Sequence, residues 1–250
     1  MAFQSRHHKI LAIIEQKGAA EVRELAELLQ SSEMTIRRDL TQLAADGLVY
    51  RTHGGAMKVG LAPRPVKFEN KAAANAERKD HIARLAAAEV EEGDILFLDC
   101  GSTVFRLCPF IRNKKITVVT NSLPVVEELM ASEVAVNLVG GEVDKQRRAV
   151  HGRMAGEHLA RYRATKAFVG VDGISLKSGL TAHSEKEAEI TLAMAAHAQK
   201  TFLLCDSTKL ERESYYQFAP LTLIHTLLTD ADAPDELAEK YRQAGVNIRR

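Results

Sequence analysis

The chain has 250 residues, of which 46% are hydrophobic and 27% charged, and its formal net charge is +1. These values are ordinary for a globular protein with a sizeable core, in one large domain or two smaller ones, and they exclude a globally basic nucleic-acid binder. Any contact with nucleic acid must therefore come from a local patch. Residues 1–79 hold 13 Lys+Arg against 9 Asp+Glu (+4), and the remainder holds 21 against 24 (−3). This mild asymmetry has the sign expected of a DNA-reading front half.

The compartment is indicated by the cysteines and by the N-terminus. Cys100, Cys108 and Cys205 are widely spaced and form neither a CxxC pair nor a zinc spacing, so a reduced cytoplasm is the natural compartment. The N-terminus turns polar at once, and no apolar run reaches membrane-spanning length. We therefore expect a soluble cytoplasmic protein with no signal peptide, no membrane partner, no metal and no cofactor.

The first sixty residues alternate short amphipathic helices with tight turns. The pattern predicts helices over 4–17, 21–29 and 33–45, with a turn at 30–32 and a helix stop at Asp46-Gly47. Ser32 is a suitable N-cap for the third helix, whose apolar face is formed by Ile36, Leu40 and Leu43. A helix, a short turn and a second helix is the helix-turn-helix arrangement, in which the second helix enters the major groove.

A change of period follows Gly47. Residues 48–57 predict a small β-hairpin, because Gly54-Gly55 can adopt the positive φ values of a tight turn. The hairpin would be the wing of a winged helix. Arg51, His53 and Lys58 lie where a wing meets the DNA backbone, and such phosphate contacts position a protein without reading bases. For His53, a turn residue without any contact is an equal alternative.

Two motifs in this region carry a family resemblance. They are Arg6 … Ile10 … Ile14 … Ser32-x-x-Thr35-Ile36-Arg37-Arg38-Asp39-Leu40 and Arg51-Thr52-His53-Gly54-Gly55-Ala56. Over residues 6–57 the chain resembles the DeoR-type bacterial regulators, sugar-catabolism repressors that include the glycerol-3-phosphate repressors. The candidate DNA-binding residues are Arg6, Ser32, Met34, Thr35, Arg37, Arg38, Arg51 and His53.

The rest of the chain predicts a linker and a larger domain. We expect a DNA-binding domain over 1–58, a linker over 59–75 with helix-breaking Pro63 and Pro65, and a second domain over 76–250 that a helix over 71–91 introduces. Strands are predicted at 95–99, 116–120, 134–139, 167–171, 201–205 and 224–228. Helices are predicted between and after them at 103–111, 123–131, 153–162, 184–198 and 234–244. This alternation predicts an α/β domain with a mainly parallel sheet covered on both faces.

The predicted strand ends are polar and small, and ligands of such sheets bind at the carboxyl ends of the strands. Asp99-Cys100-Gly101-Ser102-Thr103 stands before a helix, where a phosphate would fit. The family resemblance implies a fold like ribose-5-phosphate isomerase and a phosphorylated sugar or related metabolite as effector. It implies that Gly101, Ser102 and Thr103 hold the phosphate and that other strand ends line the pocket or meet the hydroxyls. The complete candidate set is Asp99, Gly101, Ser102, Thr103, Thr120, Asn121, Gly140, Gly141, Asp172, Gly173, Glu185, Asp206 and Lys209.

Other classes of function remain open from the residues alone. Asp172, Lys177 and Glu185 could form an acid-base set for sugar-phosphate isomerisation, although Glu185 also suits the first turn of a helix. A metal-responsive repressor would need ligands drawn from scattered residues, namely His7, His8, Cys100, Cys108, His183 and Cys205. The favoured interpretation is a non-enzymatic repressor of a carbohydrate catabolic operon. It binds double-stranded operator DNA as a homo-oligomer, dimer or tetramer, because one short helix reads only a half-site.

Overall fold

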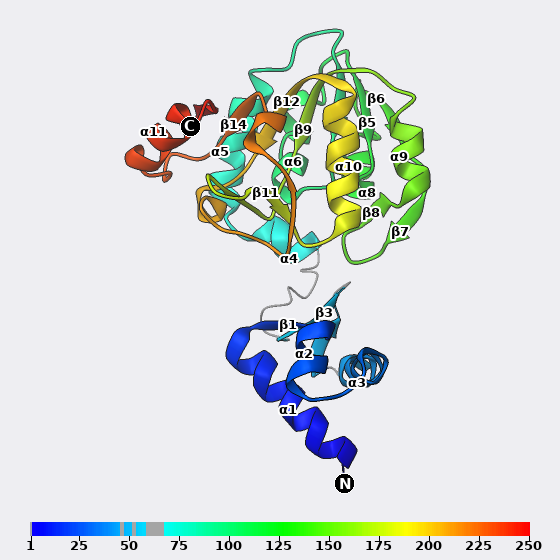
Figure 1. The fold of residues 1–250 in the computed structure, drawn as a ribbon. Helices are drawn as coiled ribbons and strands as arrows, with labels where there is room; N and C mark the ends of the chain where they lie inside the picture. Colours follow the sequence, from blue (N-terminus) through cyan, green and yellow to red (C-terminus); the bar gives the residue numbers. More distant parts are fainter. Residues whose placement is uncertain (1, 46–47, 52–53, 59–67) are drawn as a thin grey trace. The chain divides into compact units, whose positions relative to one another are not determined.

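The computed structural model describes residues 2–45, 48–51, 54–58 and 68–250, and the chain forms two compact units, Met1–Arg64 and Pro65–Arg250 (Figure 1). Three predictions fall outside the described residues: the helix stop at Asp46-Gly47, His53, and most of the linker.

The first unit is a winged helix-turn-helix. It contains helices α1 (Ala2–Lys17), α2 (Val22–Leu28) and α3 (Glu33–Ala45) and strands β1 (Ala19–Glu21), β2 (Val49–Arg51) and β3 (Gly55–Lys58). The β2–β3 pair is the predicted hairpin, and β1, which the periodicity missed because it is so short, pairs with β3. Gly55 is required there, since a Cβ at this position would lie 2.1 Å from the carbonyl oxygen of Ala20.

The apolar faces predicted for the helices form the core of this unit. Ile36, Leu40 and Leu43 of α3 are buried together with Ile10 and Leu25 from the two preceding helices. The N-cap prediction is also confirmed, because the backbone N–H of Thr35 donates to Oγ of Ser32 at 3.3 Å. Packing therefore fixes which side of α3 faces inward and leaves the opposite side to solvent.

The second unit is built on a seven-stranded sheet in the order β15-β14-β12-β9-β4-β5-β6, with every neighbouring pair parallel. The strands are β4 (Ile95–Leu98), β5 (Thr117–Thr120), β6 (Ala135–Leu138), β9 (Ala164–Val169), β12 (Ala198–Leu204), β14 (Thr226–Leu228) and β15 (Asn247–Arg249). The first six strands in chain order overlap the six predicted ones, although β9 and β12 each begin three residues earlier than predicted. The predicted fold class, a winged helix-turn-helix joined to an α/β domain, is confirmed.

Helices cover both faces of this sheet (Figure 1). One face packs against α5 (Ala76–Ala87), α6 (Ser102–Phe105), α7 (Cys108–Ile111) and α8 (Leu123–Leu129). The other packs against α9 (Arg153–Leu159), α10 (Glu185–Ala196) and α11 (Asp235–Gln243). Two predicted helices are each divided: 103–111 is α6 and α7, and 71–91 is α4 (Phe68–Ala73) and α5, separated by Asn75 with φ of 54°.

Small antiparallel elements, which the alternation of strand and helix did not predict, lie beside the main sheet. β7 (Glu142–Asp144) and β8 (Ala149–His151) form a hairpin, and β10 (Gly173–Ser175), β11 (Gly179–Ala182) and β13 (Tyr216–Ala219) form a three-stranded sheet. These elements follow strand ends of the main sheet, so they are positioned to build the surroundings of a ligand site.

Candidate functional site

The order of the strands fixes the place of the site. From β4 the chain moves outward through β5 to β6, and β9 then enters on the other side of β4. The connections therefore leave in opposite directions between β4 and β9, and such a switch point opens a crevice at the carboxyl ends of the two strands. Asp99-Cys100-Gly101 follows β4, and Gly170-Val171-Asp172 follows β9.

A pocket of about 480 Å³, including the space open to solvent, lies at this crevice. Its charged lining comes from separate parts of the second unit: α4, the two strand ends, the turn between β7 and β8, α10, and the 207–209 turn. The lining residues are Lys71, Asp99, Cys100, Gly101, Ser102, Thr103, Arg147, Gly170, Val171, Asp172, Ala182, Glu187, Thr191, Lys209 and Phe218.

Asp99 ties the floor of the pocket together. Its Oδ1 accepts from the backbone N–H of Cys100 at 2.7 Å, and its Oδ2 accepts from the N–H of Gly170 at 3.2 Å and from Oγ1 of Thr191 at 3.4 Å. One carboxylate thus joins the ends of β4 and β9 to α10. With both oxygens engaged in this way, Asp99 positions the strand ends.

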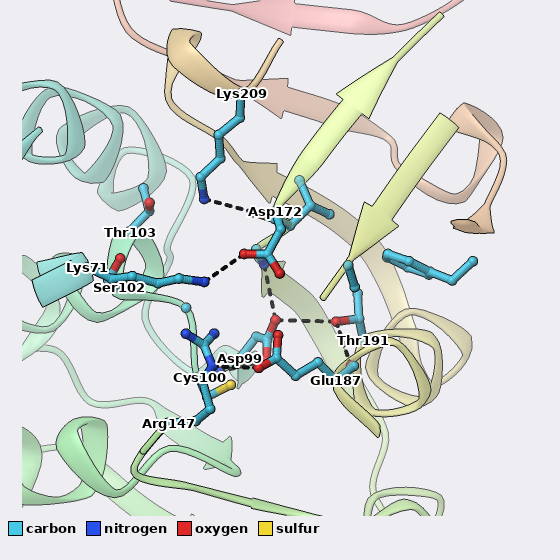
Figure 2. A pocket seen from close by; sticks show the side chains of 15 residues that line it. Lys71, Asp99, Cys100, Ser102, Thr103, Arg147, Asp172, Glu187, Thr191 and Lys209 are labelled. Carbon is cyan, nitrogen blue, oxygen red and sulfur yellow. Dashed lines mark hydrogen bonds and ion pairs between the residues drawn. The ribbon is translucent and has the colours of Figure 1, made fainter. Parts of the chain in front are cut away.

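Two ion pairs cross the pocket (Figure 2). Nζ of Lys71 donates to Oδ1 of Asp172 at 2.7 Å, and Nε of Arg147 lies 2.5 Å from Oε1 of Glu187. Burial lowers the pKa of Lys71 and raises that of Glu187. Burial alone would also raise the pKa of Asp172, but the neighbouring Lys71 ammonium holds it well below its usual range. Burial thus opposes the charged form of these side chains, and the opposite charge of the partner favours it.

Lys209 points toward the same space from the other side (Figure 2). Its Nζ donates to the carbonyl of Val171 at 2.7 Å, a neutral acceptor that leaves the positive charge uncompensated by this contact. In the same lining the charges of Lys71, Arg147 and Lys209 are matched in number by those of Asp99, Asp172 and Glu187. Lys71 and Arg147 are paired with carboxylates, so Lys209 is the cation best placed to donate to an anion.

The structure brings together six of the predicted effector residues and places the others outside the pocket lining. The six are Asp99, Gly101, Ser102, Thr103, Asp172 and Lys209. Those outside the lining are Thr120, Asn121, Gly140, Gly141, Gly173, Glu185 and Asp206. The helix that follows Gly101 is only four residues long, so α6 offers a weaker anion site than the predicted helix 103–111.

Several residues outside the lining have structural contacts instead. Thr120 donates to the carbonyl of Leu98 at 2.6 Å, and Asn121 donates to the carbonyl of Val150 at 3.1 Å. A Cβ on Gly141 would lie 2.7 Å from the carbonyl oxygen of His151, and one on Gly173 would lie 2.4 Å from that of Arg212. These small residues permit close backbone packing.

Glu185 and Asp206 differ from expectation in another way. Glu185 is exposed in the first turn of α10, which agrees with the alternative interpretation of this residue as a first-turn helix carboxylate. Asp206 is buried and accepts hydrogen bonds from Oγ1 of Thr208 and from Nδ2 of Asn75 at the start of α5. Glu185 thus faces away from the pocket, whereas Asp206 lies beside it and supports the 207–209 turn.

Four polar residues of the pocket were missed by the sequence reasoning: Lys71, Arg147, Glu187 and Thr191. A signal existed for two of them, because Glu187, Thr191 and Met194 recur at i, i+4 and i+7 and so share the inward face of α10. No comparable signal existed for Lys71 and Arg147, since their approach to the pocket depends on tertiary packing.

The exposed side of α3 forms the candidate DNA-binding surface. Met34 is 81% exposed, Arg37 and Arg38 are also exposed, and Arg37 pairs with Glu33 one turn earlier at 3.3 Å. Arg6, which is predicted to hold the DNA backbone, also has a contact within the unit: its guanidinium donates to both oxygens of Asp39, whose side chain is 1% exposed. Arg6 thereby ties α1 to the recognition helix.

The geometry does not assemble the alternative sites. Lys177 borders a groove beside Gln217 and Leu221, and Glu185 is exposed, so neither joins Asp172 in the candidate pocket. Within the described ranges there is no group of three or more His, Cys, Asp and Glu side chains arranged to hold a metal ion.

The two units each match a known domain. Residues 6–59 match the DeoR-like helix-turn-helix domain, and residues 74–231 match the DeoR C-terminal sensor domain. The chain belongs to the DeoR family. It is a DNA-binding transcriptional regulator, and the predicted resemblance is confirmed.

Similar DeoR-family proteins align over nearly the whole chain. The HTH-type transcriptional regulator GlpR of Haloferax volcanii is 33% identical over 97% of this chain and 96% of its own length. The lactose phosphotransferase system repressor of Lactococcus lactis is 35% identical over 95% of each. The HTH-type transcriptional repressor GlcR of Bacillus subtilis is 32% identical over 96% of this chain and 93% of its own.

Among solved structures, ribose 5-phosphate isomerase A of Methanocaldococcus jannaschii is similar over 55% of each chain, with 19% identity and a TM-score of 0.41. In the described part of this DeoR-family regulator, no helix combines the length and the apolar character needed to cross a membrane.

Proposed function

We propose that this DeoR-family regulator represses an operon for carbohydrate breakdown. We further propose that a phosphorylated sugar, bound in the pocket at the carboxyl ends of β4 and β9, changes its affinity for the operator. The observation that carries the proposal is the convergence of Lys71, Arg147 and Lys209 on one small polar pocket that also holds Asp172 and Glu187. Cationic donors suit a phosphate group, and carboxylates suit sugar hydroxyls.

On the DNA side, α3 enters a major groove and the wing contacts the backbone. Arg37 and Arg38 offer forked donors that suit the O6/N7 edge of guanine or phosphate oxygens, and exposed Met34 suits a thymine methyl group. Thr35 assists at the start of the helix. We assign to Arg6 a supporting role, because its bonds to buried Asp39 fix the recognition helix.

On the effector side, phosphate oxygens accept from Lys209 and from the hydroxyls of Ser102 and Thr103 in the turn after Gly101. The sugar hydroxyls donate to Asp172 and Glu187. Both carboxylates are already held by cations at 2.7 and 2.5 Å, so they are oriented before a ligand arrives. Such preorganisation favours a small polyhydroxylated anion over a bare apolar ligand.

The names of the relatives agree with this assignment. The B. subtilis and L. lactis relatives are named as repressors, and the latter is a repressor of a lactose phosphotransferase system. We extend to this chain the role of repressor in carbohydrate metabolism, and we propose that it acts in the cytoplasm, without catalytic turnover, as a homo-oligomer.

A thermal-shift screen tests the effector assignment. The purified protein is heated with a panel of sugar phosphates, with the matching free sugars, and with inorganic phosphate. A ligand that binds only the folded state raises Tm. At a ligand concentration one hundred times Kd, it raises the free energy of unfolding by about 2.7 kcal/mol. We expect a sugar phosphate to raise Tm and its free sugar to have no effect. Equal shifts by free sugars, or no shift by any phosphate, would refute the assignment.

DNA binding is tested separately. Sequences selected from a random duplex library by the full-length protein are used in mobility-shift assays, and the stabilising sugar phosphate is then titrated into the complex. We expect the sugar phosphate to change operator affinity. An unchanged affinity at saturating ligand would remove the regulatory link while leaving the binding site intact.

A further inference from the structure

Exposed apolar side chains lie on the edge strand β6 and on the elements that precede and follow it in the chain. Met130 at the end of α8 is 72% exposed, Leu138 in β6 39%, Val143 in β7 52% and Met154 in α9 65%. Since α8 packs on β6, and the N–H of Gly140 directly after β6 donates to Nδ1 of His158 in α9 at 3.1 Å, these elements are neighbours. Figure 1 shows β6 at the end of the sheet, with α9 beside it.

The edge strand itself is unprotected. Among the described residues, β6 pairs only with β5. The N–H groups of Ala135 and Val139 donate toward β5, to Ile116 and Thr120. Because backbone groups of alternate strand residues point to opposite sides, those of Val136 and Leu138 point away from β5, into the open edge. Soluble proteins guard such edges with charge, proline or bulges, and Ala-Val-Asn-Leu contains none of these.

We propose that this edge is the interface with a second copy of the chain, formed by antiparallel pairing of β6 with the β6 strand of the partner copy. An antiparallel pair of identical strands obeys a two-fold axis, so one strand supplies both sides of the contact. In the register centred on Asn137, the outward backbone groups of Val136 meet those of the partner's Leu138, and the reverse. The exposed methionines on the flanking helices then cover the joint from both faces of the sheet.

The charged rim favours a second copy over an unrelated partner. The neighbouring face of α9 carries both signs, with Arg153 and Glu157 paired at 2.7 Å and Arg161 exposed next to them. A surface with interspersed signs can be complementary to itself across a two-fold axis, whereas a surface of one sign would repel its copy. The surface lies on β6 and its flanking helices, and none of its exposed apolar residues lines the effector pocket.

Disulfide trapping tests the register in the full-length protein. Asn137 and the partner's Asn137 would form a non-hydrogen-bonded pair with Cα atoms roughly 4.5 Å apart, a separation that a disulfide spans. The native cysteines Cys100, Cys108 and Cys205 are all buried, so Asn137→Cys introduces a more accessible thiol, at a half-buried position on the edge strand. We expect mild oxidation to convert most of this variant into a covalent dimer. Phe110→Cys, at a 41% exposed position on α7, is the control and should remain monomeric in denaturing gels.

A charge substitution tests the interface without oxidation. Leu138→Arg places a charge at the two-fold joint and should weaken dimerisation in analytical ultracentrifugation by about tenfold or more, the effect of 1.4 kcal/mol. Circular dichroism and the Tm of the variant without ligand report whether it is folded. Phe110→Arg should leave the sedimentation profile unchanged.

Three outcomes would overturn the proposal: a monomeric wild-type protein, a dimer that dissociates with Phe110→Arg but not with Leu138→Arg, or no cross-linking of Asn137→Cys. None of these outcomes concerns effector binding. Failure of the interface and failure of the proposed function are therefore separate results.

Discussion

Replacement of Asp172 by Asn tests the electrostatic design of the pocket. The Asp172 carboxylate accepts from Nζ of Lys71 at 2.7 Å and from the backbone N–H of His183 at 3.0 Å, and its side chain is 7% exposed. Removal of one partner of a buried pair costs about 3–5 kcal/mol, because the other charge is left uncompensated. The two bonds are accepted by different oxygens, Oδ1 and Oδ2, and Asn keeps only one oxygen. Because that oxygen can still accept one of the two bonds, we expect a loss of about 2–3 kcal/mol.

The same change should strengthen the binding of a simple anion. With Asp172 neutral, Lys71 and Lys209 face the pocket with one negative charge fewer between them. We expect inorganic phosphate to bind more tightly by roughly a factor of ten, which corresponds to 1.4 kcal/mol. This is less than the interaction energy of roughly 4 kcal/mol between two unit charges 4 Å apart near a protein surface. The assay is a Tm measurement with and without phosphate. Without phosphate, the Tm of the variant should be about 4–12 °C below that of the wild type, at 2–4 °C for each kcal/mol lost. The rise in Tm on addition of phosphate should be larger for the variant than for the wild type.

Asp94→Asn is the matched control. Nζ of Lys166 donates to Oδ2 of Asp94 at 2.6 Å, with side chains 11% and 7% exposed, so this ion pair is similarly buried. Asp94 directly precedes β4 and therefore lies at the amino end of the strand, opposite the pocket. We expect Asp94→Asn to lose stability without any change in phosphate affinity. If Asp172→Asn weakens binding of inorganic phosphate, or if Asp94→Asn strengthens it equally, the assignment of the cationic pocket is wrong.

Three further results are expected. Arg38→Ala should weaken specific operator binding by about 1–3 kcal/mol in mobility-shift assays if Arg38 contacts a base, and its Tm should stay at the wild-type value; unchanged affinity would place recognition elsewhere. Arg6→Met should lower both operator affinity and the stability of the first unit, because buried Asp39 loses its guanidinium partner. A loss of DNA binding without a loss of stability would instead indicate that Arg6 contacts the DNA backbone directly. Burial lowers the pKa of His183 from 6.5 to about 4, so the unfolded state binds more protons between these pH values. Stability should thus fall by up to about 3 kcal/mol as the pH drops from 6.5 to 4, and urea titrations of His183→Asn should show a shallower decline.

Local pattern was sufficient to predict most of the fold. The i, i+4, i+7 spacing of Ile36, Leu40 and Leu43 predicts the buried face of α3, and the structure buries all three. The apolar run that became β4 was equally clear, because a strand covered on both faces needs apolar residues. β9 begins three residues before the predicted strand 167–171, and the pattern missed this start because Thr165 and Lys166 are polar. The antiparallel β7–β8 hairpin was missed, because its strands are three residues long and carry little periodicity.

The site was predictable only where it follows strand ends. Asp99 directly follows β4 and Asp172 lies three residues after the end of β9, and the rule for open parallel sheets locates both. The same rule treated all strand ends alike, and so it also selected Asn121 and Gly141. Strand order decides which ends meet, and strand order is a tertiary property that the sequence pattern left open. Lys71 was missed for a different reason: the pattern assigned its segment to one undivided helix, and the approach of α4 to the pocket depends on tertiary packing.

The balance of charge in the pocket limits how an effector can bind. Lys71 and Arg147 are each paired with a carboxylate, whereas Lys209 donates to the neutral carbonyl of Val171. A phosphate that bonds to Lys209 alone leaves both ion pairs in place, whereas a phosphate that also bonds to Lys71 competes with Asp172 for that ammonium. Lys71 belongs to α4, the first described helix of the second unit, and Lys79 of α5 donates to the carbonyls of Lys71 and Ala74. Competition for Lys71 therefore acts directly on the segment by which the chain enters the sensor domain. A ligand can shift a conformational equilibrium only through contacts that differ between the two states, and we propose the Lys71–Asp172 pair as that contact.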